Sequence, residues 1–487
     1  MHLLRKKYYF ILIAIPVISG FMHIKIFGLD LVGIHVWRQT QTQTVINNFA
    51  KEDINILNPK VNENPDTDRI FRMEFPIMQW LFSLFYKIFG DQIIISRILS
   101  FITGLLSVLG LFVLFRKIFS DNFLAAAGAW AFNFSPVFYY YTLNPLPDNF
   151  ALCMSIWSLA FFFIWIDSNR LFHFIFCGFF LCLAALAKLP FILYASAIFS
   201  YFFFAVIKKK NSTKHLFIPF LFSLIFLIPV FAWYIYVIPH WHGNGIVAGI
   251  LNEADFSQIS DLLFHNIVST LPELLINYGS LLFFLAAIYF ISRNKIYHHK
   301  YFYIFFVLGL SIAAYFFFEI NMIGKVHDYY LFPFLPLIFL LVVYGIKKMI
   351  NSQNKALKYI TFFLLLILPV TAYLRSNSRW NTKDPGFNPV LYSHKKELRA
   401  LCSDNALCIA GNDESRYIFL YYINKKGWVF DKDNLNKDNI EKWMSKGAKY
   451  LFSDSRSDTS QEIKNYLDTL IFEQGTLKVF KLKTQHN

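Results

Sequence analysis

Long apolar stretches separated by short polar junctions run from residue 8 to residue 374. Because a helix needs about 20 apolar residues to cross a bilayer, these stretches predict about eleven spanning helices. The predicted spans are residues 8–27, 92–115, 122–141, 148–166, 171–187, 190–207, 216–238, 273–292, 301–319, 329–346 and 357–374. The pattern therefore predicts an all-α polytopic membrane bundle.

Composition supports a membrane protein, since 56% of the residues are hydrophobic and only 16% are charged. A soluble protein has about 25% charged residues. The net charge of +15 comes largely from clusters at the ends of apolar stretches. These clusters are Arg5–Lys7, Arg116–Lys117, Lys208–Lys210, Arg293–Lys300 and Lys347–Lys348. They are typical of topology signals, not of a nucleic-acid surface.

A cytoplasmic N-terminus places every basic cluster on the cytoplasmic side of the membrane, as the positive-inside rule requires. The outer side then holds 28–91, 142–147, 188–189, 239–272, 320–328 and the residues after about 375. We therefore expect a multi-pass protein with a long first outer loop at 28–91.

The last part of the chain, 376–487, has the polarity of a soluble domain. Strands are predicted at 407–410, 450–452 and 477–482, and helices at 416–423, 436–446 and 460–470. We expect a small extracytoplasmic α/β domain that follows a membrane domain of residues 1–375.

The first outer loop carries Asp30, His35, Trp37, Arg38 and Glu74. Arginine binds phosphate through two nitrogen atoms, and histidine accepts protons near neutral pH. The alternative is structural: Trp and Arg are common at membrane surfaces, and Glu suits a helix N-terminus.

Four further outer-side positions can carry charge at membrane depth, where ionisable groups suggest function. Asp148 opens a predicted span, Lys188 lies in a tight hairpin, and Lys325 and His327 precede another span together with Tyr329. Asp148 alone is equally explained as a helix cap, and Tyr329 as an interfacial residue.

No cofactor is established by the sequence. A divalent ion held by Glu74, His240 and His242 is a weak alternative, because their spacing is not that of a typical metal site. Walker, GxSxG and HExxH motifs do not occur, which argues against common nucleotide-driven and hydrolytic chemistry. A group transferred on the outer side is therefore expected to come from an activated lipid.

Three motifs then give a family resemblance over roughly residues 1–350. The stretches EFPIMQWLFSLFYKIFG (74–90), NPLPDNFAL (144–152) and HDYYLFPFLPLIFLL (327–341) occur in this order after a first outer loop. The chain resembles the GT-C glycosyltransferases of the family 39 type, which include protein O-mannosyltransferases and bacterial lipid A aminoarabinose transferases.

The resemblance implies a polyprenyl-phosphate sugar as donor and a lipid, glycan or protein as acceptor. It also implies an acidic residue early in the first loop, where this chain has Asp30 and, beside the Trp37-Arg38 pair, His35. His35, Asp30 and Asp148 are then candidates for accepting the acceptor's proton. Arg38, Lys188, Lys325 and His327 are candidates for binding the donor phosphate.

Two other functions compete with this interpretation. A lipid-linked polysaccharide ligase or polymerase uses the same donor class, although 239–272 lacks the arginines expected of its large outer loop. A transporter is less favoured, because the polar residues gather at one membrane face. The compact chain suits the inner membrane of a bacterium.

Overall fold

The computed structural model describes residues 8–207, 214–241, 256–294, 301–324, 327–432, 435–454 and 460–483. The chain forms two compact units. The helical unit takes its described residues from 1–27, 73–78 and 97–378, and the mixed unit from 28–72, 79–96 and 379–487. The sequence placed the whole first outer loop in the membrane domain, whereas most of that loop lies in the mixed unit.

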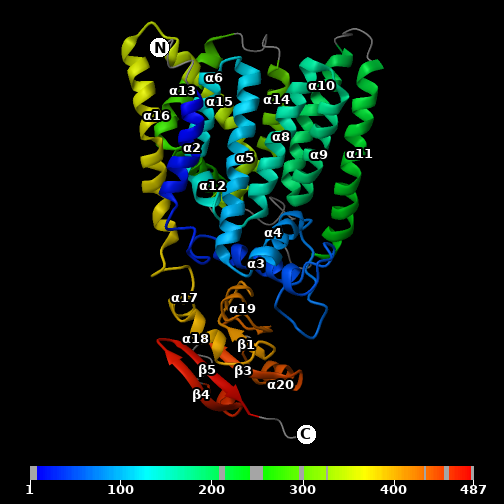
Figure 1. Cartoon of the computed structure of the whole chain (residues 1–487), viewed down its shortest axis with the longest axis vertical. Coiled ribbons are helices and arrows are strands. Elements are labelled where there is room, and N and C mark those ends of the chain that lie inside the picture. The colour runs from blue at the N-terminus through cyan, green and yellow to red at the C-terminus, as the bar shows by residue number, and fades with distance from the viewer. Residues whose placement is uncertain are drawn as a thin grey trace. The chain divides into compact units, whose positions relative to one another are not determined.

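The helical unit consists of helices joined mainly by short turns (Figure 1). They are α2 (Tyr9–Met22), α5 (Ile93–Phe119), α6 (Asn122–Asn133), α7 (Pro136–Tyr141), α8 (Pro147–Ser168), α9 (Leu171–Ala187), η1 (Leu189–Tyr194), α10 (Ala195–Ile207), α11 (Lys214–Val237), η2 (Ile238–His240), α12 (Phe256–His265), η5 (Asn266–Ile276), α13 (Tyr278–Arg293), α14 (Phe302–Phe318), η7 (Asp328–Phe334), α15 (Leu335–Ile350) and α16 (Lys355–Ser376).

Within the described residues, seven helices are long and apolar enough to cross a membrane. They are Ile93–Phe119, Pro147–Ser168, Leu189–Ile207, Leu216–His240, Ser257–Ile276, Asp328–Ile350 and Lys355–Trp380. All except Ser257–Ile276 coincide with predicted spans. Four other predicted spans correspond to shorter apolar helices, namely α2, α9, α13 and α14.

Close helix packing depends on small residues, as is usual in membranes. In α15, a Cβ atom added to Gly345 would lie 1.8 Å from the carbonyl oxygen of Phe283 in α13. In α9, a Cβ atom on Gly178 would lie 2.3 Å from the ring of Phe226 in α11. Any larger residue at these two positions would push the neighbouring helices apart.

Two predicted spans are interrupted, and side-chain hydrogen bonds hold each break. The predicted span 122–141 divides into α6 and α7 at Pro136, because proline disfavours helical geometry in the preceding residue. Ser135 donates to the carbonyl oxygen of Leu275 (2.7 Å). Asn277, with φ 78°, separates η5 from α13 and donates to the carbonyl oxygen of Phe134 (2.8 Å).

The second break corrects the predicted span 273–292. Its helix α13 begins at Tyr278, and the preceding α12 and η5 form an apolar helical stretch where the sequence analysis placed an outer loop. Polar residues such as Ser257, Gln258 and Asp261 lower the mean hydropathy of this stretch, so the sequence analysis did not predict a span there.

The mixed unit combines helices with one sheet (Figure 1). Its elements are α3 (Val36–Lys51), α4 (Ile77–Phe89), η8 (Asn377–Trp380), α17 (Pro389–Ser393), α18 (Lys395–Ala400), β1 (Leu407–Gly411), α19 (Ile418–Ile423), β2 (Lys426–Val429), α20 (Lys437–Ser445), β3 (Ala448–Ser453), α21 (Gln461–Lys464), β4 (Leu467–Gln474) and β5 (Leu477–Leu482). The strand order is β2-β1-β3-β5-β4. Strands β2, β1 and β3 are parallel, and β5 and β4 form an antiparallel hairpin at one edge.

Strand β1 is buried on both faces and alternates between two apolar cores, whereas the edge strand β4 is largely exposed. Cys408 and Ala410 of β1 face one core, while Ile409 faces the other. The first core also contains Leu31 and Val36, which come from the first outer loop. The loop therefore supplies apolar residues that the C-terminal segment alone does not have.

The same loop also covers the β2 edge of the sheet. Asn64 donates its backbone N–H to the carbonyl oxygen of Gly427 (3.0 Å), and Gly427 donates to that of Asn62 (3.1 Å). The indole of Trp428 donates to Asp66 (2.8 Å). These bonds satisfy backbone groups that an open sheet edge would expose to solvent.

The expected C-terminal α/β domain is confirmed, with two differences in its elements. Strand β2 was not predicted, because Lys426–Val429 is short and contains Gly427. The predicted helix 460–470 is α21 followed by β4, since the helix stops at Lys464.

Replacing Leu31, which has no exposed surface, with alanine tests the contribution of the loop to the core. We expect Leu31→Ala to destabilise the mixed unit by about 3 kcal/mol, because a buried leucine leaves a cavity. Thermal unfolding of the purified protein would measure the change. Leu57→Ala, at a side chain 49% exposed, is the matched control and should unfold like the wild type. Equal stability of the two variants would contradict the role of Leu31.

Candidate functional site

Asp148 and Lys188 form a buried ion pair in the helical unit. Asp148 lies in the first turn of α8 and Lys188 caps the C-terminal end of α9, so each charge complements its helix dipole. The ammonium nitrogen lies 3.8 Å from the nearer carboxylate oxygen, and the side chains are 15% and 2% exposed, respectively. Neither charge would be stable there without its partner.

Aromatic side chains surround the ammonium group of Lys188. Its nitrogen lies 5.1 Å from the ring centre of Tyr330 and 5.8 Å from that of Tyr329, both in η7. The imidazole of His327 lies 5.1 Å from the Tyr330 ring and 5.5 Å from the Tyr329 ring. The structure thus brings four predicted residues together: Asp148, Lys188, His327 and Tyr329.

Four residues of this cluster, Tyr330 among them, were not predicted as site residues. The hydroxyl of Tyr141 donates to the buried carboxylate of Asp328. Glu319 caps the C-terminal end of α14 and is buried, and its Oε2 atom accepts no hydrogen bond from any described residue. The signal for Glu319 was present, since it was an acidic residue at the end of a predicted apolar span. Asp328 is the next residue after His327 in the chain, but it was not predicted as a site residue.

Arg97 fixes the loop that leads into α8. It lies inside the apolar helix α5, has no exposed surface, and donates to the side-chain oxygen of Asn144 (2.9 Å) and the carbonyl oxygen of Leu143 (3.2 Å). Asn149 donates to the carbonyl oxygen of Asn144 (3.2 Å). These bonds hold the turn that positions Asp148 at the helix start.

Glu74 also belongs to the helical unit and is buried. The next residue, Phe75, donates its backbone N–H to the carbonyl oxygen of Leu186 (3.0 Å), close to Lys188 in the chain. His240 is exposed and bonds to the carbonyl oxygen of Tyr236 in its own helix (2.8 Å). No group of three His, Cys, Asp or Glu side chains suited to a metal ion occurs in the described part of the chain. Lys325 and His242 lie outside the described residues.

Asp30 is held by hydrogen bonds within the mixed unit. Its carboxylate accepts from the ammonium of Lys395, from the hydroxyl of Tyr421 (2.6 Å) and from the backbone N–H of Leu31 (2.8 Å). Burial by itself would raise the pKa of Asp30, but the charge of Lys395 and these hydrogen bonds hold that pKa below its usual value. Asp30 therefore anchors the start of the first loop to α18 and α19.

His35 has a backbone conformation that is rare for histidine. Its φ of 54° and ψ of 33° lie in the left-handed region, where a residue with a Cβ costs about 1 kcal/mol or more. It directly precedes α3. Glycine would occupy this position without strain, so histidine here carries a backbone cost that its side chain must offset.

Trp37 and Arg38 lie in the first turn of α3 with different surroundings. Trp37 is partly buried against the core that contains Leu31. Arg38 is only 4% exposed and donates to the side-chain oxygen of Gln41 one turn later. Burial raises the pKa of the nearby Tyr417 to about 12, and the charge of Arg38 partly opposes this rise.

A polar cavity of about 820 Å³ opens in the mixed unit. His35 and Trp37 line it on one side. The remaining lining residues are Gly33, Ile34, Val36, Gly386, Phe387, Asn388, Asn412, Asp413, Glu414, Ser415, Ile418, Phe419 and Asp454. The structure therefore places two predicted site residues beside a cavity of the size that small ligands occupy.

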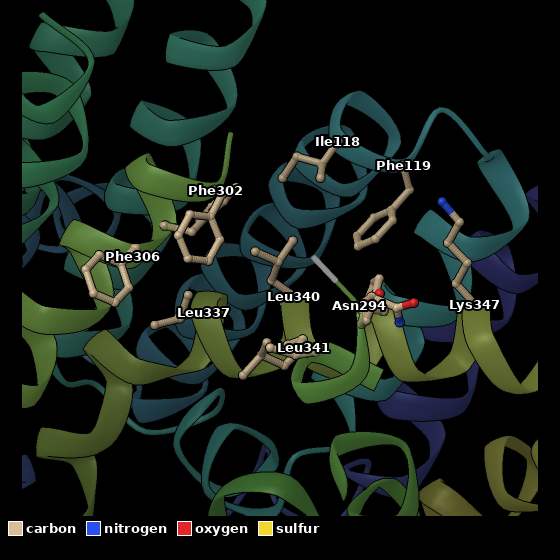
Figure 2. A pocket seen from close by; sticks show the side chains of 12 residues that line it. Ile118, Phe119, Asn294, Phe302, Phe306, Leu337, Leu340, Leu341 and Lys347 are labelled. Atoms are coloured by element: carbon tan, nitrogen blue, oxygen red, sulfur yellow. The ribbon is translucent and has the colours of Figure 1, made fainter. Parts of the chain in front are cut away.

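Another cavity, of about 460 Å³, lies in the helical unit and is mostly apolar. Figure 2 shows side chains from α5, α14 and α15 around it, with Lys347 and Asn294 as its polar members. None of the predicted site residues lines this cavity.

A family model described as dolichyl-phosphate-mannose-protein mannosyltransferase matches residues 74–233, the segment that contains Glu74, Asp148 and Lys188. No curated protein matches the chain. Among solved structures, ArnT from Cupriavidus metallidurans in the apo state covers 98% of this chain and 98% of its own, with 11% identity and a TM-score of 0.67.

The chain has the GT-C glycosyltransferase fold. The same ArnT bound to undecaprenyl phosphate is similar as well, with 10% identity, 97% and 98% coverage and a TM-score of 0.62. The oligosaccharyltransferase AglB from Archaeoglobus fulgidus, in complex with an inhibitory peptide and a dolichol phosphate, matches 92% of this chain and 69% of its own, with 13% identity and a TM-score of 0.54.

These findings confirm the resemblance to GT-C proteins and the expected membrane bundle with a small sheet domain. The match to the mannosyltransferase family model supports the expected enzyme class, a membrane glycosyltransferase. The chain is a multi-pass membrane protein, since seven helices among its described residues are long and apolar enough to cross a membrane. The assignment of individual site residues and of a metal stays a prediction.

The lowered pKa of Asp30 predicts acid sensitivity of the mixed unit. Because the folded-state pKa is below the unfolded value of about 3.9, the stabilisation is complete above that value and is lost as the pH falls through the folded-state pKa. Asp30→Asn should cost about 3 kcal/mol near pH 7, since it leaves Lys395 buried without its partner. Unfolding temperatures between about pH 7 and about pH 3 would show the difference from wild type shrinking with acid. Asp384→Asn, at an exposed carboxylate, should change nothing, and a pH-independent difference for Asp30→Asn would contradict the ion pair.

Proposed function

We propose that this protein transfers a sugar from a polyprenyl-phosphate donor to a lipid, glycan or protein acceptor at the outer face of a bacterial inner membrane, with its N-terminus in the cytoplasm. The observation that carries the proposal is the cluster of Asp148, Lys188, His327, Tyr329 and Tyr330, called the Lys188 cluster below. Asp148 and Lys188 lie in the segment matched by the mannosyltransferase family model. The undecaprenyl phosphate and dolichol phosphate in the similar structures support a lipid-linked donor.

The Lys188 cluster suits the phosphate of the donor. A cation that is largely removed from water interacts with a phosphate more strongly than an exposed cation does. Asp148 and the tyrosine rings hold the ammonium group in place before the donor binds. The imidazole of His327, which lies next to the same two tyrosines, offers a second nitrogen-containing group that can bind a phosphate.

The reaction is a single displacement at the anomeric carbon. An acceptor hydroxyl forms the new carbon–oxygen bond, and the bond from that carbon to the phosphate oxygen breaks. Polyprenyl phosphate leaves with the bonding electrons, and its charge is stabilised by Lys188 and His327. The hydroxyl proton passes to a base.

Among the candidate bases, His35 fits the role best. Asp30 is occupied by three hydrogen bonds, and Asp148 is paired with Lys188. His35 lines an open cavity in a strained conformation, and imidazole is suited to proton transfer near neutral pH.

Lys188→Met tests the proposed function directly. Cells that lack the gene should lose a glycosylated envelope lipid, glycan or protein, and mass spectrometry of envelope extracts would detect the loss. The wild-type gene should restore the product, whereas Lys188→Met should lower it by about 100-fold. An unchanged envelope in cells without the gene would overturn the proposed function.

The chain supplies a matched control for this variant. Lys117 pairs with Asp167 (2.9 Å) near the C-terminal end of α8, whereas Lys188 pairs with the carboxylate at the N-terminal end of the same helix. Lys117→Met should restore the product fully. A similar loss with both variants would point to general damage and not to a phosphate site.

Two substitutions separate the side chain of His35 from its backbone. His35→Gly relieves the left-handed strain and His35→Asn tolerates it, so both should leave the protein folded. Both should lower transfer by about 100-fold or more, because neither offers a base. Transfer that survives in either variant would mean that another residue accepts the proton. His240→Gln is the control substitution of a histidine, and it should leave transfer unchanged.

A further inference from the structure

We propose that the polar cavity of the mixed unit binds an uncharged saccharide ring. This inference rests on the proposed function, because it names the kind of substrate that the cavity accepts. Its basis is the sheet topology together with the chemistry of the lining residues.

The cavity lies where the sheet topology favours a ligand site. In the order β2-β1-β3, the chain continues from β1 to one side and then returns to the other side, so the connections diverge at the β1–β3 junction. In open sheets with parallel strands, ligands bind outside the carboxyl ends of strands at such a junction. Asn412, Asp413 and Glu414 follow β1, and Asp454 follows β3.

The main-chain hydrogen bonds hold these two strand ends together. Asp454 donates its N–H to the carbonyl oxygen of Gly411 (2.6 Å), and Asp413 donates to that of Phe430 (3.0 Å). Asn388 donates to the hydroxyl of Thr476 (2.9 Å), which in turn donates to the carboxylate of Asp454. The acceptor groups are therefore fixed before a ligand arrives.

The lining is suited to hydroxyl groups. Glu414 and Asp454 offer carboxylate oxygens, although Glu414 also pairs with Lys432 (2.8 Å). The carboxylate of Asp413 accepts from Ser415 and from the backbone N–H of Phe419 (3.0 Å), so it holds the wall of the cavity in place. Asn412 offers an amide whose oxygen is buried and accepts no hydrogen bond within the described residues. A hydroxyl hydrogen bond to a carboxylate is stronger than one to a neutral acceptor.

The aromatic residues complete the match to a sugar ring. Trp37, Phe387 and Phe419 also line the cavity. A sugar ring carries hydroxyl groups at its edge and an apolar C–H surface on its face, and flat aromatic rings pack against such surfaces.

Two other ligand classes fit less well. A phosphate group would meet several carboxylates, and the described lining contains no lysine or arginine. A metal ion needs at least three ligating side chains around one point, and the described carboxylates of the cavity do not form such a group. Carboxylates spread around a wide cavity contact different hydroxyl groups of one larger ligand.

Saturation-transfer NMR of the full-length protein in nanodiscs would test the inference, with oligosaccharides released from the cell envelope as the probe. Wild type should bind a neutral oligosaccharide. Asp454→Ala and Asn388→Ala should weaken binding by about tenfold, because each removes a fixed polar group. Asp468→Ala, at an exposed carboxylate on β4, should bind like wild type. Absence of binding by wild type, or equal binding by all variants, would overturn the inference.

Competition experiments decide between ligand classes and between sources of the sugar. Millimolar inorganic phosphate or calcium should leave saccharide binding unchanged, and displacement by either one would contradict a saccharide site. If the ring belongs to the acceptor, Asp454→Ala raises the KM for the acceptor alone, and if it belongs to the donor, the KM for the donor alone. Saccharide binding by a protein without transferase activity would overturn the proposed function and leave this inference standing.

Discussion

The ion pair of Asp148 and Lys188 constrains where two helices of the helical unit begin and end. Two charges removed from water are stable only when each keeps its partner and its favourable helix end. The pair therefore requires α8 to start and α9 to stop at the same place, and Arg97 serves this requirement by holding the turn before α8. Tyr329 and Tyr330 then tie η7 to the same point.

A different constraint shapes the mixed unit. An open parallel edge and an incomplete core each make a sheet less stable. The first loop supplies both missing parts, since Asn62 and Asn64 bond to Gly427 at the β2 edge and Leu31 fills the core. The length of the loop thus allows it to complete a domain whose other residues come from the C-terminal part of the sequence. Because His35 and Trp37 belong to this loop, they lie beside the cavity.

Sequence patterns predicted the features of the structure that depend on residues close together in the chain. Hydropathy located most spanning helices, and outer-side charge located Asp148, Lys188 and His327, which the structure brings into one cluster with Tyr329. Features that depend on distant partners were missed. The ion pair of Asp30 joins residues 365 positions apart, and the break at Asn277 is held by the carbonyl oxygen of Phe134. No local pattern encodes such contacts.

The two candidate sites differ in electrostatic character, and this difference indicates which part of a substrate each site suits. The Lys188 cluster offers a cation among aromatic rings, which attracts a phosphate, whereas the cavity beside Asp454 offers carboxylates, which repel one. A polyprenyl-phosphate sugar has one anionic part and one neutral part. A neutral glycan acceptor offers hydroxyl groups and carries no charge. A phosphate that entered the carboxylate-lined cavity would meet like charges there, so this cavity suits the neutral sugar ring and the Lys188 cluster suits the phosphate.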